Sequence, residues 1–359
     1  MNNKIQKKVL LDLSVLKHPY CGLGQIALNY VRLINSLDTT RLPFRFVLLV
    51  PRKYYGCCGD KADYVPRKRL YKFLPWLYPK VDVWHAIHQL SSFRPYSHDT
   101  RYLLTIHDFN FMYEKSKKVA DQYHRRVQAR INRADFITCI SQFTETELHR
   151  WMTVPADTPV RVIYNGVEFA SAEEMSYKPV QVSTDKPFFF SIGEIKEKKN
   201  FLAIVRMMQY MPDYHLYLAG KDNTPYAEQI RLYIKQNGIC NVTLLGIVSN
   251  EERLWLYRYC AAFLFPSLFE GFGLPVIEAM AELKPVFSSP FTSLKEIGGN
   301  YAFFFNEDFE PQQMANTVKD GLCNVTKGHL KAQQKYAHSY QYNIHFNNYI
   351  KLYTQLCNG

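Results

Sequence analysis

The chain has 359 residues, which is more than one ordinary hydrophobic core holds, so we expect two domains. Hydrophobic residues make up 47% and charged residues 21%, as is typical of a folded soluble protein. No stretch approaches the roughly 18 apolar residues of a membrane span, and the first residues lack the apolar core of a signal peptide. We therefore expect a cytoplasmic protein, and its net charge of +12 predicts attraction to an anionic partner.

In the first half of the chain, short and fully apolar segments alternate with amphipathic ones. Strands are expected at residues 9–13, 44–50, 81–86, 102–106, 136–140 and 160–164. Helices are expected directly after Gly24, at 117–133 and at 144–151. Short apolar strands separated by helices are typical of a parallel sheet that is covered on both faces.

The stretch 169–186 lacks periodicity and predicts an interdomain linker. A second series of elements follows it, with strands expected at 187–192, 215–219, 242–245 and 261–265, and helices at 201–210, 226–236 and 251–259. The sequence thus predicts an α/β fold in which two Rossmann-like, doubly wound domains face each other across a cleft. Ligands of such sheets bind beyond the carboxyl ends of the strands, so functional residues are expected in strand-to-helix loops.

Residues 51–80 form a basic and aromatic segment. They hold eight Lys and Arg against two Asp, with seven Tyr, Phe or Trp between them. This composition favours an anionic membrane surface, where cations meet lipid headgroups and amphipathic rings lie in the interface. A plain solvated loop is the second interpretation, and stacking on single-stranded nucleic acid is a distant third.

The stretch FEGFGLP, residues 269–275, joins a predicted strand to the apolar helix that begins near Pro275. Proline is favoured at a helix start, and the free backbone N–H groups there suit a diphosphate. Gly271 and Gly273 let the backbone approach a ligand closely. Glu270 and Glu278 could hold hydroxyls on either side of that diphosphate. An isolated GFG would more often be an ordinary glycine turn with two surface acids.

The longer string PSLFEGFGLPVIEAM resembles the E-x7-E signature of family 4 glycosyltransferases, which are retaining, nucleotide-sugar-dependent enzymes with the GT-B fold. Other stretches match this family in order along nearly the whole chain: LLTIHDFNFMY, ADFITCISQFTETEL, VRVIYNGVE, FSIGEIKEKKNFLAIV and LKPVFSSPFTSLKEIGG. The TIHDFNF stretch leans toward the mannosyltransferase-like branch and hence toward GDP-mannose.

The resemblance assigns roles to residues of the second half. It implies that Glu278 binds the donor ribose, that Glu270 contacts the donor sugar and that Lys199 binds the diphosphate. The backbone around this loop is expected to meet the sugar and the diphosphate, through Gly271, Phe272, Gly273 and Leu274. Gly193 ends the strand that opens the second domain, next to the basic loop.

In the first half, Gly22 and Gly24 precede a helix, and the resemblance implies that this glycine loop lies against the diphosphate. The resemblance also places His107 near the donor sugar and the reaction centre, although a lone His-Asp pair is more often structural. The sequence departs from the family at Glu194, where many members carry Arg. An acid there would repel a diphosphate if it pointed inward, unless Lys196 and Lys198 substitute for the missing cation.

The resemblance names the expected parts of the chain: an acceptor domain at 1–168, the linker at 169–186, a donor domain at 187–335 and a helix at 336–359 that crosses back to the first domain. No Asp-x-Asp box and no Cys/His ligand spacing is present in the sequence, so we expect a metal-independent transferase without a cofactor. Its partners are then a nucleotide-sugar donor and a glycan or lipid-linked acceptor, with no nucleic acid.

Two other functions stay open. A nucleotide-sugar epimerase on the same fold would need no acceptor, and a non-catalytic sugar-nucleotide-binding protein would bind a nucleotide without turning it over. Retention without an evident nucleophile suggests front-face transfer, in which the leaving diphosphate helps to deprotonate the acceptor hydroxyl.

Overall fold

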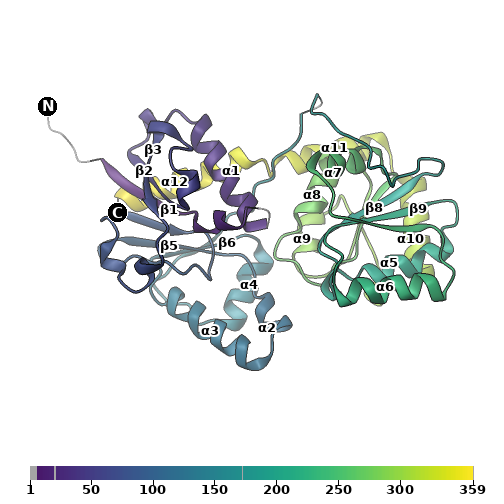
Figure 1. Ribbon diagram of the computed structural model, residues 1–359, viewed down its shortest axis with the longest axis horizontal. Coiled ribbons are helices and arrows are strands. Elements are labelled where there is room, and N and C mark those ends of the chain that lie inside the picture. Colours follow the sequence, from purple (N-terminus) through teal and green to yellow (C-terminus); the bar gives the residue numbers. More distant parts are fainter. Residues whose placement is uncertain (1–5, 20–21, 172, 359) are drawn as a thin grey trace. The chain divides into compact units, whose positions relative to one another are not determined.

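The computed structural model describes residues 6–19, 22–171 and 173–358, and its contacts divide the chain into two units. Unit 1 comprises Met1–Gly166 together with Tyr342–Gly359, and unit 2 comprises Val167–Gln341. Each unit is a parallel sheet that carries helices on both of its faces (Figure 1). The predicted α/β class with two doubly wound domains is therefore confirmed.

In unit 1, the described residues form a parallel sheet with the strand order β3-β2-β1-β4-β5-β6-β7. Its strands are β1 (Lys7–Asp12), β2 (Phe44–Val50), β3 (Ala62–Pro66), β4 (Val83–Ala86), β5 (Arg101–Ile106), β6 (Phe136–Cys139) and β7 (Val160–Val162). Its helices are α1 (Gly22–Ser36), α2 (Asn110–Glu114), α3 (Lys117–Ile131), α4 (Gln142–Trp151) and α12 (Tyr342–Asn358). Helices α1 and α12 share one core with the sheet, and α3 and α4 share the core on its other face.

Helix α12 lies within the segment predicted to cross back to the first domain, and its contacts tie it to unit 1. The ring nitrogen Nδ1 of His85 lies 2.7 Å from the hydroxyl of Tyr353. The hydroxyl of Tyr349 lies 3.1 Å from Oγ1 of Thr105. Both contacts are buried, so they fix the rotation of α12 against β4 and β5 as well as its attachment.

In unit 2, the described residues form a parallel sheet with the order β10-β9-β8-β11-β12-β13. Its strands are β8 (Phe188–Ile192), β9 (His215–Ala219), β10 (Val242–Gly246), β11 (Ala262–Phe265), β12 (Val286–Ser288) and β13 (Phe303–Phe304). Its helices are α5 (Phe201–Met207), α6 (Pro225–Gln236), α7 (Asn250–Tyr259), α8 (Leu274–Ala281), α9 (Ser293–Gly298), α10 (Pro311–Asn324) and α11 (Lys327–His338). Helices α5, α6 and α10 share a core with the sheet. Across the described ranges of both units, no helix has the length and apolarity to cross a bilayer.

The segment 169–186, predicted as a linker, is attached to unit 2. Arg258 on α7 donates to the carbonyl oxygens of Ser171 at 2.6 Å and Glu174 at 2.7 Å. The backbone N–H of Ser183 donates to the hydroxyl of Tyr217 at 2.8 Å. These bonds give the aperiodic segment a fixed course, although it forms no strand or helix in its described residues.

Candidate active site

The glycine-containing loop after β11 leads directly into α8. Gly273 is the N-cap of this helix, with φ 104° and ψ 46°, a left-handed conformation that side chains other than hydrogen disfavour. A Cβ atom at this position would lie 2.6 Å from Cδ2 of Leu294. Leu274 is the first helical residue, so Pro275 occupies the second position rather than the first. The backbone N–H groups of this turn begin a helix of eight residues, and such groups attract anions.

Two residues that sequence reasoning did not single out, Thr292 and Ser293, hold this loop. The N–H of Glu270 donates to Oγ1 of Thr292 at 3.1 Å. Ser293 Oγ donates to the carbonyl oxygens of Glu270 and Phe272, at 2.9 and 3.0 Å. Thr292 has φ 56° and ψ −139°, which is an outlier for a β-branched residue. Strain of this kind persists only where the surroundings impose it, and here the bonds to the loop do so.

Lys199 and Glu270 form an ion pair beyond the carboxyl ends of the central strands β8 and β11. The ammonium of Lys199 donates to Oε1 of Glu270, and Ser267 Oγ donates to the same oxygen at 2.8 Å. The ammonium also lies 5.0 Å from the centre of the Phe265 ring. Gly193 leaves room for this lysine, since a Cβ there would lie 3.1 Å from Cε of Lys199. The structure thus brings together three residues that the sequence analysis had linked only by resemblance.

Glu278 lies one turn inside α8, where two residues of α7 hold its carboxylate. The hydroxyl of Tyr257 donates to Oε2 at 2.8 Å, and Arg253 Nη1 donates to Oε1 at 3.3 Å. The neighbouring carboxylate raises the pKa of Arg253, and burial raises the pKa of Tyr257 well above its ordinary value. Tyr257 therefore stays a neutral donor, and the carboxylate is fixed in one orientation with lone pairs left for a ligand.

Glu194, the departure from the family pattern, is surrounded by cations. Its carboxylate lies 2.7 Å from the ammonium of Lys196 and 4.0 Å from that of Lys221. Its side chain is 40% exposed. The two lysines offset the negative charge that an isolated acid would place beside the loop of Lys199.

His107, at the end of β5 in unit 1, is buried and makes a fixed hydrogen bond. The ring nitrogen Nε2 lies 2.7 Å from the carbonyl oxygen of Ile87, and the backbone N–H of His107 donates to Oε1 of Gln89 at 3.1 Å. A carbonyl can only accept, so Nε2 carries the proton and Nδ1 is the acceptor nitrogen of the neutral ring. Burial lowers the pKa of His107 to about 4, which keeps the ring neutral at physiological pH.

We expect from the sequence that Gly22 and Gly24 form a loop before a helix, and the structure shows that this prediction is wrong. Gly22 and Gly24 lie in the first turn of α1 itself. A Cβ at Gly24 would lie 2.2 Å from the carbonyl oxygen of His18, so the glycine allows close backbone packing there. Cys21, which begins the same stretch, lies outside the described residues.

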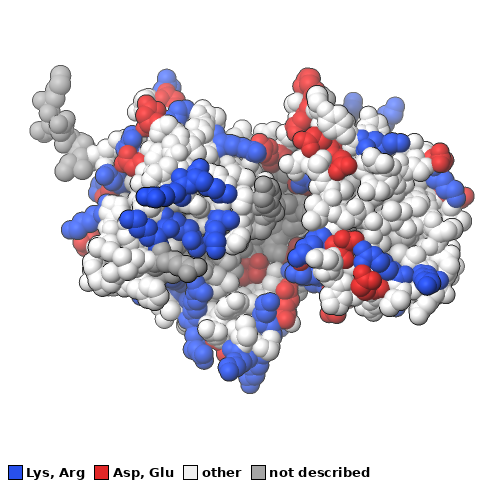
Figure 2. Space-filling view, viewed as in Figure 1, with Lys and Arg blue, Asp and Glu red and all other residues white. Residues whose placement is uncertain are grey.

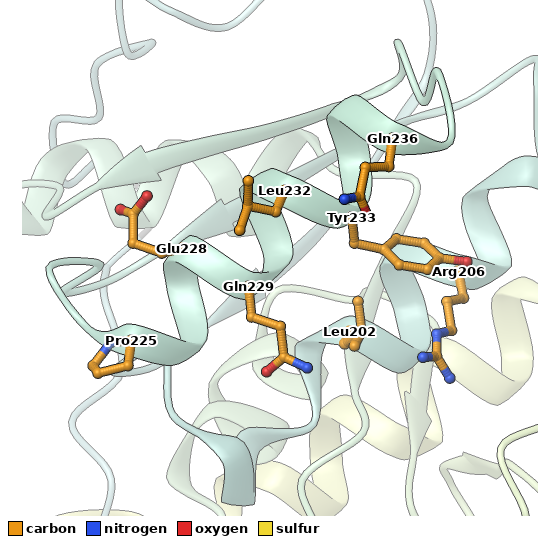
Figure 3. A pocket seen from close by; sticks show the side chains of 8 residues that line it. All are labelled: Leu202, Arg206, Pro225, Glu228, Gln229, Leu232, Tyr233 and Gln236. Atoms are coloured by element: carbon orange, nitrogen blue, oxygen red, sulfur yellow. The ribbon is translucent and has the colours of Figure 1, made fainter.

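A surface groove of about 410 Å³ lies elsewhere on unit 2, between α5 and α6 (Figure 3). Its lining consists of Leu202, Arg206, Pro225, Glu228, Gln229, Leu232, Tyr233 and Gln236. None of these is a predicted site residue, and the guanidinium of Arg206 rests 5.2 Å from the centre of the Tyr233 ring. We therefore place the candidate site at the α8 loop, where the hydrogen-bonded acids and the lysine converge, and not in this groove.

Solved structures built from two parallel α/β units show the fold. HepE of Anabaena, solved in complex with UDP-glucose, aligns with a TM-score of 0.73 over 97% of this chain and 99% of its own, at 16% identity. Sucrose-phosphate synthase of Thermosynechococcus elongatus aligns with a TM-score of 0.71 over 98% and 99%, at 19% identity. The fold is therefore GT-B.

Two family models then match most of the sequence: Glycosyltransferase Family 4 over residues 33–170, and Glycosyl transferases group 1 over residues 174–338. The chain belongs to this glycosyltransferase family, which confirms the resemblance. The O-antigen chain mannosyltransferase B of Escherichia coli is 24% identical over 82% of this chain and 85% of its own length. The serotype-specific mannosyltransferase WbdA of Escherichia coli is 29% identical over 63% of this chain, but this match spans only 30% of WbdA.

Proposed function

We propose that the chain is a retaining glycosyltransferase that moves a hexose from a nucleotide-diphosphate sugar to a glycan or lipid-linked acceptor in cell-surface polysaccharide synthesis. One observation carries this proposal. In unit 2, the ion pair of Lys199 and Glu270 lies at the loop that starts α8, and Glu278 is held one turn inside that helix. A cation, a helix start and two oriented carboxylates are the groups that a nucleotide-diphosphate sugar needs.

The donor would bind along this loop. Glu278 would accept hydrogen bonds from the ribose hydroxyls with its remaining lone pairs. The diphosphate would lie at the start of α8, near Gly273 and Leu274, and would compete with Glu270 for the ammonium of Lys199. Ser267 donates a hydrogen bond to Glu270 at 2.8 Å, and this bond would keep the carboxylate oriented toward the sugar hydroxyls when the lysine turns to the phosphates.

The transfer would break the bond between the anomeric carbon and the diphosphate oxygen, while the acceptor oxygen bonds to that carbon on the same face. The acceptor proton would pass to the departing diphosphate. Negative charge grows on the leaving group during this step, and a positioned ammonium with helix N–H groups stabilises it. We propose that Lys199 and α8 do this without a metal ion or a cofactor.

His107 is proposed to act near the donor sugar as a neutral hydrogen-bonding group. Its depressed pKa rules out a stable imidazolium, and the bond from Nε2 to the carbonyl of Ile87 presents Nδ1 as an acceptor. An acceptor nitrogen of this kind suits a sugar hydroxyl.

The donor is proposed to be GDP-mannose, with a UDP-hexose as the alternative. Relatives named as mannosyltransferases, one of them an O-antigen chain mannosyltransferase, support the first choice. A structural neighbour solved with UDP-glucose supports the second. We further propose that the protein works in the cytoplasm at the inner face of an anionic membrane, where a lipid-linked acceptor would be found, and that nucleic acid is not a partner.

The test is thermal stabilisation by UDP, GDP and their hexose conjugates, in the wild type and in Glu278→Ala. A ligand at about 100 times its dissociation constant adds roughly 2.7 kcal/mol, which is a readable shift. We expect one nucleotide to stabilise the wild type and the variant to lose that shift. Glu282→Ala is the matched control, because Glu282 follows α8 directly and pairs with Arg258 instead. It should keep the nucleotide shift.

Turnover then separates the transferase from the two alternatives. Product that forms only with an acceptor, and keeps the anomeric configuration of the donor, supports retaining transfer. A rearranged sugar released from the donor alone would establish an epimerase, and binding without any turnover would establish a non-catalytic protein. Absence of stabilisation by every nucleotide would refute the donor site itself.

A further inference from the structure

The excess positive charge of the chain belongs to one unit. Unit 1 carries 27 Lys and Arg against 13 Asp and Glu, whereas unit 2 carries 17 against 19. Figure 2 shows Lys and Arg gathered on the visible face of the unit that contains α1 and β1, with few acids between them. The proposed diphosphate site lies in unit 2, so donor binding does not explain the charge. A function of this charge beyond solubility therefore requires an anionic partner other than the nucleotide-sugar donor.

The basic and aromatic segment 51–80 is only partly available to such a partner. Its middle, Ala62–Pro66, folds into the sheet as β3, an edge strand that was not predicted from sequence. The ammonium of Lys61 donates to the carbonyl oxygens of Asn35 and Leu37. Asp63 on β3 pairs with Arg45 at 2.8 Å. These groups are paired within unit 1, so the residues of the segment that remain available to a partner lie after β3.

Beyond β3, five large apolar side chains point into solvent, and we call them the apolar patch. They are Leu70, Phe73, Trp76, Leu77 and Tyr96. Phe73 is 77% exposed, Trp76 56% and Tyr96 62%. The rings of Trp76 and Tyr96 lie 5.9 Å apart, which joins the two chain segments into one surface.

The patch is displayed by anchored backbone. Tyr71 and Tyr78 alternate with the exposed residues in sequence, and their ring centres lie 4.5 Å apart. Tyr78 is buried and packs edge-on against Trp84 at 4.9 Å. Leu70, Trp76 and Leu77 project from two short 3-10 helices, Arg69–Lys72 and Pro75–Leu77, and Phe73 lies between these helices. The packing of Tyr71 and Tyr78 holds this segment against the core of unit 1.

Cations outnumber acids in the sequence around the patch, where the exposed acid Asp99 lies three residues beyond Tyr96. Residues 67–96 contain six Lys and Arg but only one acid, Asp82. That acid already accepts a hydrogen bond from the ammonium of Lys7 at 2.8 Å. Lys68, Lys80 and Arg94 are exposed. Exposed aromatic and aliphatic side chains beside exposed cations match the interface of an anionic bilayer, where rings enter the headgroup region and cations meet lipid phosphates.

We propose that the apolar patch and the cations around it form the surface by which unit 1 docks on an anionic bilayer. The patch contains none of the proposed donor-site residues. The biological purpose of this docking, access to a lipid-linked acceptor, rests on the proposed function. The binding itself depends on unit 1 alone.

The test is co-flotation of the full chain with vesicles of phosphatidylcholine, with and without phosphatidylglycerol, at low and high salt. We expect binding only to the anionic vesicles, weakened by salt. The variant Phe73→Ala/Trp76→Ala/Leu77→Ala should lower the partition coefficient by about tenfold or more. The matched control is Val180→Ala/Ile247→Ala, since these side chains are 95% and 80% exposed on unit 2. It should bind as the wild type does.

The charged part is tested separately. Lys68→Ser and Arg94→Ser should each weaken binding about fivefold, because a cation near an anionic surface contributes on the order of that factor. Lys235→Ser and Lys319→Ser, which remove exposed cations of unit 2, should leave it unchanged.

Fluorescence then reports where the vesicle touches the protein. The emission of Trp76 should shift to shorter wavelength on anionic vesicles, and Trp76→Phe should keep most of the binding but lose the shift. No binding to anionic vesicles at low salt would overturn the proposal. So would binding that survives the triple substitution or that leaves the emission unchanged. Nucleotide stabilisation, measured on the same variants, should stay intact, so failure here is distinct from failure of the donor site.

Discussion

Replacing Tyr257 by Phe removes one oxygen atom and tests whether the carboxylate of Glu278 must be held in place to bind a nucleotide. The lost hydrogen bond of 2.8 Å joins a buried hydroxyl to a charged acceptor, and such bonds contribute about 1.5–3 kcal/mol. The ring itself should stay, because it packs against Phe190 and Phe263 with ring centres 5.1 and 5.3 Å away. Arg253 remains as the second restraint on the carboxylate.

We expect the melting temperature to fall by roughly 3–12 °C, since a unit of this size loses about 2–4 °C per kcal/mol. The dissociation constant of the nucleotide should rise about fivefold, which corresponds to about 1 kcal/mol of lost orientation. Because Glu278 is proposed to contact the ribose and not the reacting bond, KM for the donor should rise while kcat changes little.

Thermal melting and donor kinetics measure both effects. Tyr259→Phe is the control, as it makes the same change on the same helix at a side chain that is 60% exposed. If Tyr257→Phe melts earlier but binds nucleotide as tightly as the wild type, the hydrogen bond serves only the fold. The assignment of a donor-positioning role to α7 would then be wrong.

Three further results are expected. Gly273→Ala should lower the free energy of unfolding by about 1–3 kcal/mol, because alanine is strained at φ 104°. This variant should also lose the rise in melting temperature that the nucleotide causes, and an unchanged rise would argue against a site at this turn. Glu194→Arg should tighten UDP or GDP binding several-fold in calorimetry by adding a cation beside Lys199, whereas Glu197→Arg, an exposed neighbour, should do so less. Burial lowers the pKa of His107 and His345 to about 4, from an ordinary value of 6.5. Between pH 6.5 and 4 the unfolded chain therefore binds more protons than the folded one. Urea titrations should show the unfolding free energy falling as pH drops through this window, by at most about 1.4 kcal/mol per pH unit for each histidine; a flat profile would contradict this.

The parallel sheets could be predicted from sequence because their strands are buried on both faces. Such strands are unbroken apolar runs, and the expected bounds of β2 and β9 agree with Phe44–Val50 and His215–Ala219. Strand β3 was missed for the opposite reason. It is an edge strand, ADYVP, whose polar residues and proline lie within a basic segment.

Some residues of the candidate site could likewise be predicted from the sequence, and others could not. Glu270, Glu278 and the glycines between them are contiguous in sequence, so a motif reveals them. Thr292 and Tyr257 act through hydrogen bonds to residues 22 and 21 positions away, and no local pattern marks such partners. A β-branched residue at positive φ leaves no signature in the sequence, since any loop could contain a Thr-Ser pair.

Helix α12 also sets the order in which the molecule can be completed. Ribosomes add residues 342–358 after the whole of unit 2, yet these residues supply Phe346, Tyr349 and Tyr353 to the core around β1 and β2. Unit 2 is an uninterrupted run, so it can close as soon as it has been translated. Unit 1 begins first and finishes last, and throughout the synthesis of its neighbour it exposes the apolar face that α12 will cover. A newly made chain therefore spends about half of its translation with a hydrophobic surface open to chaperones, or to other unfinished copies of itself.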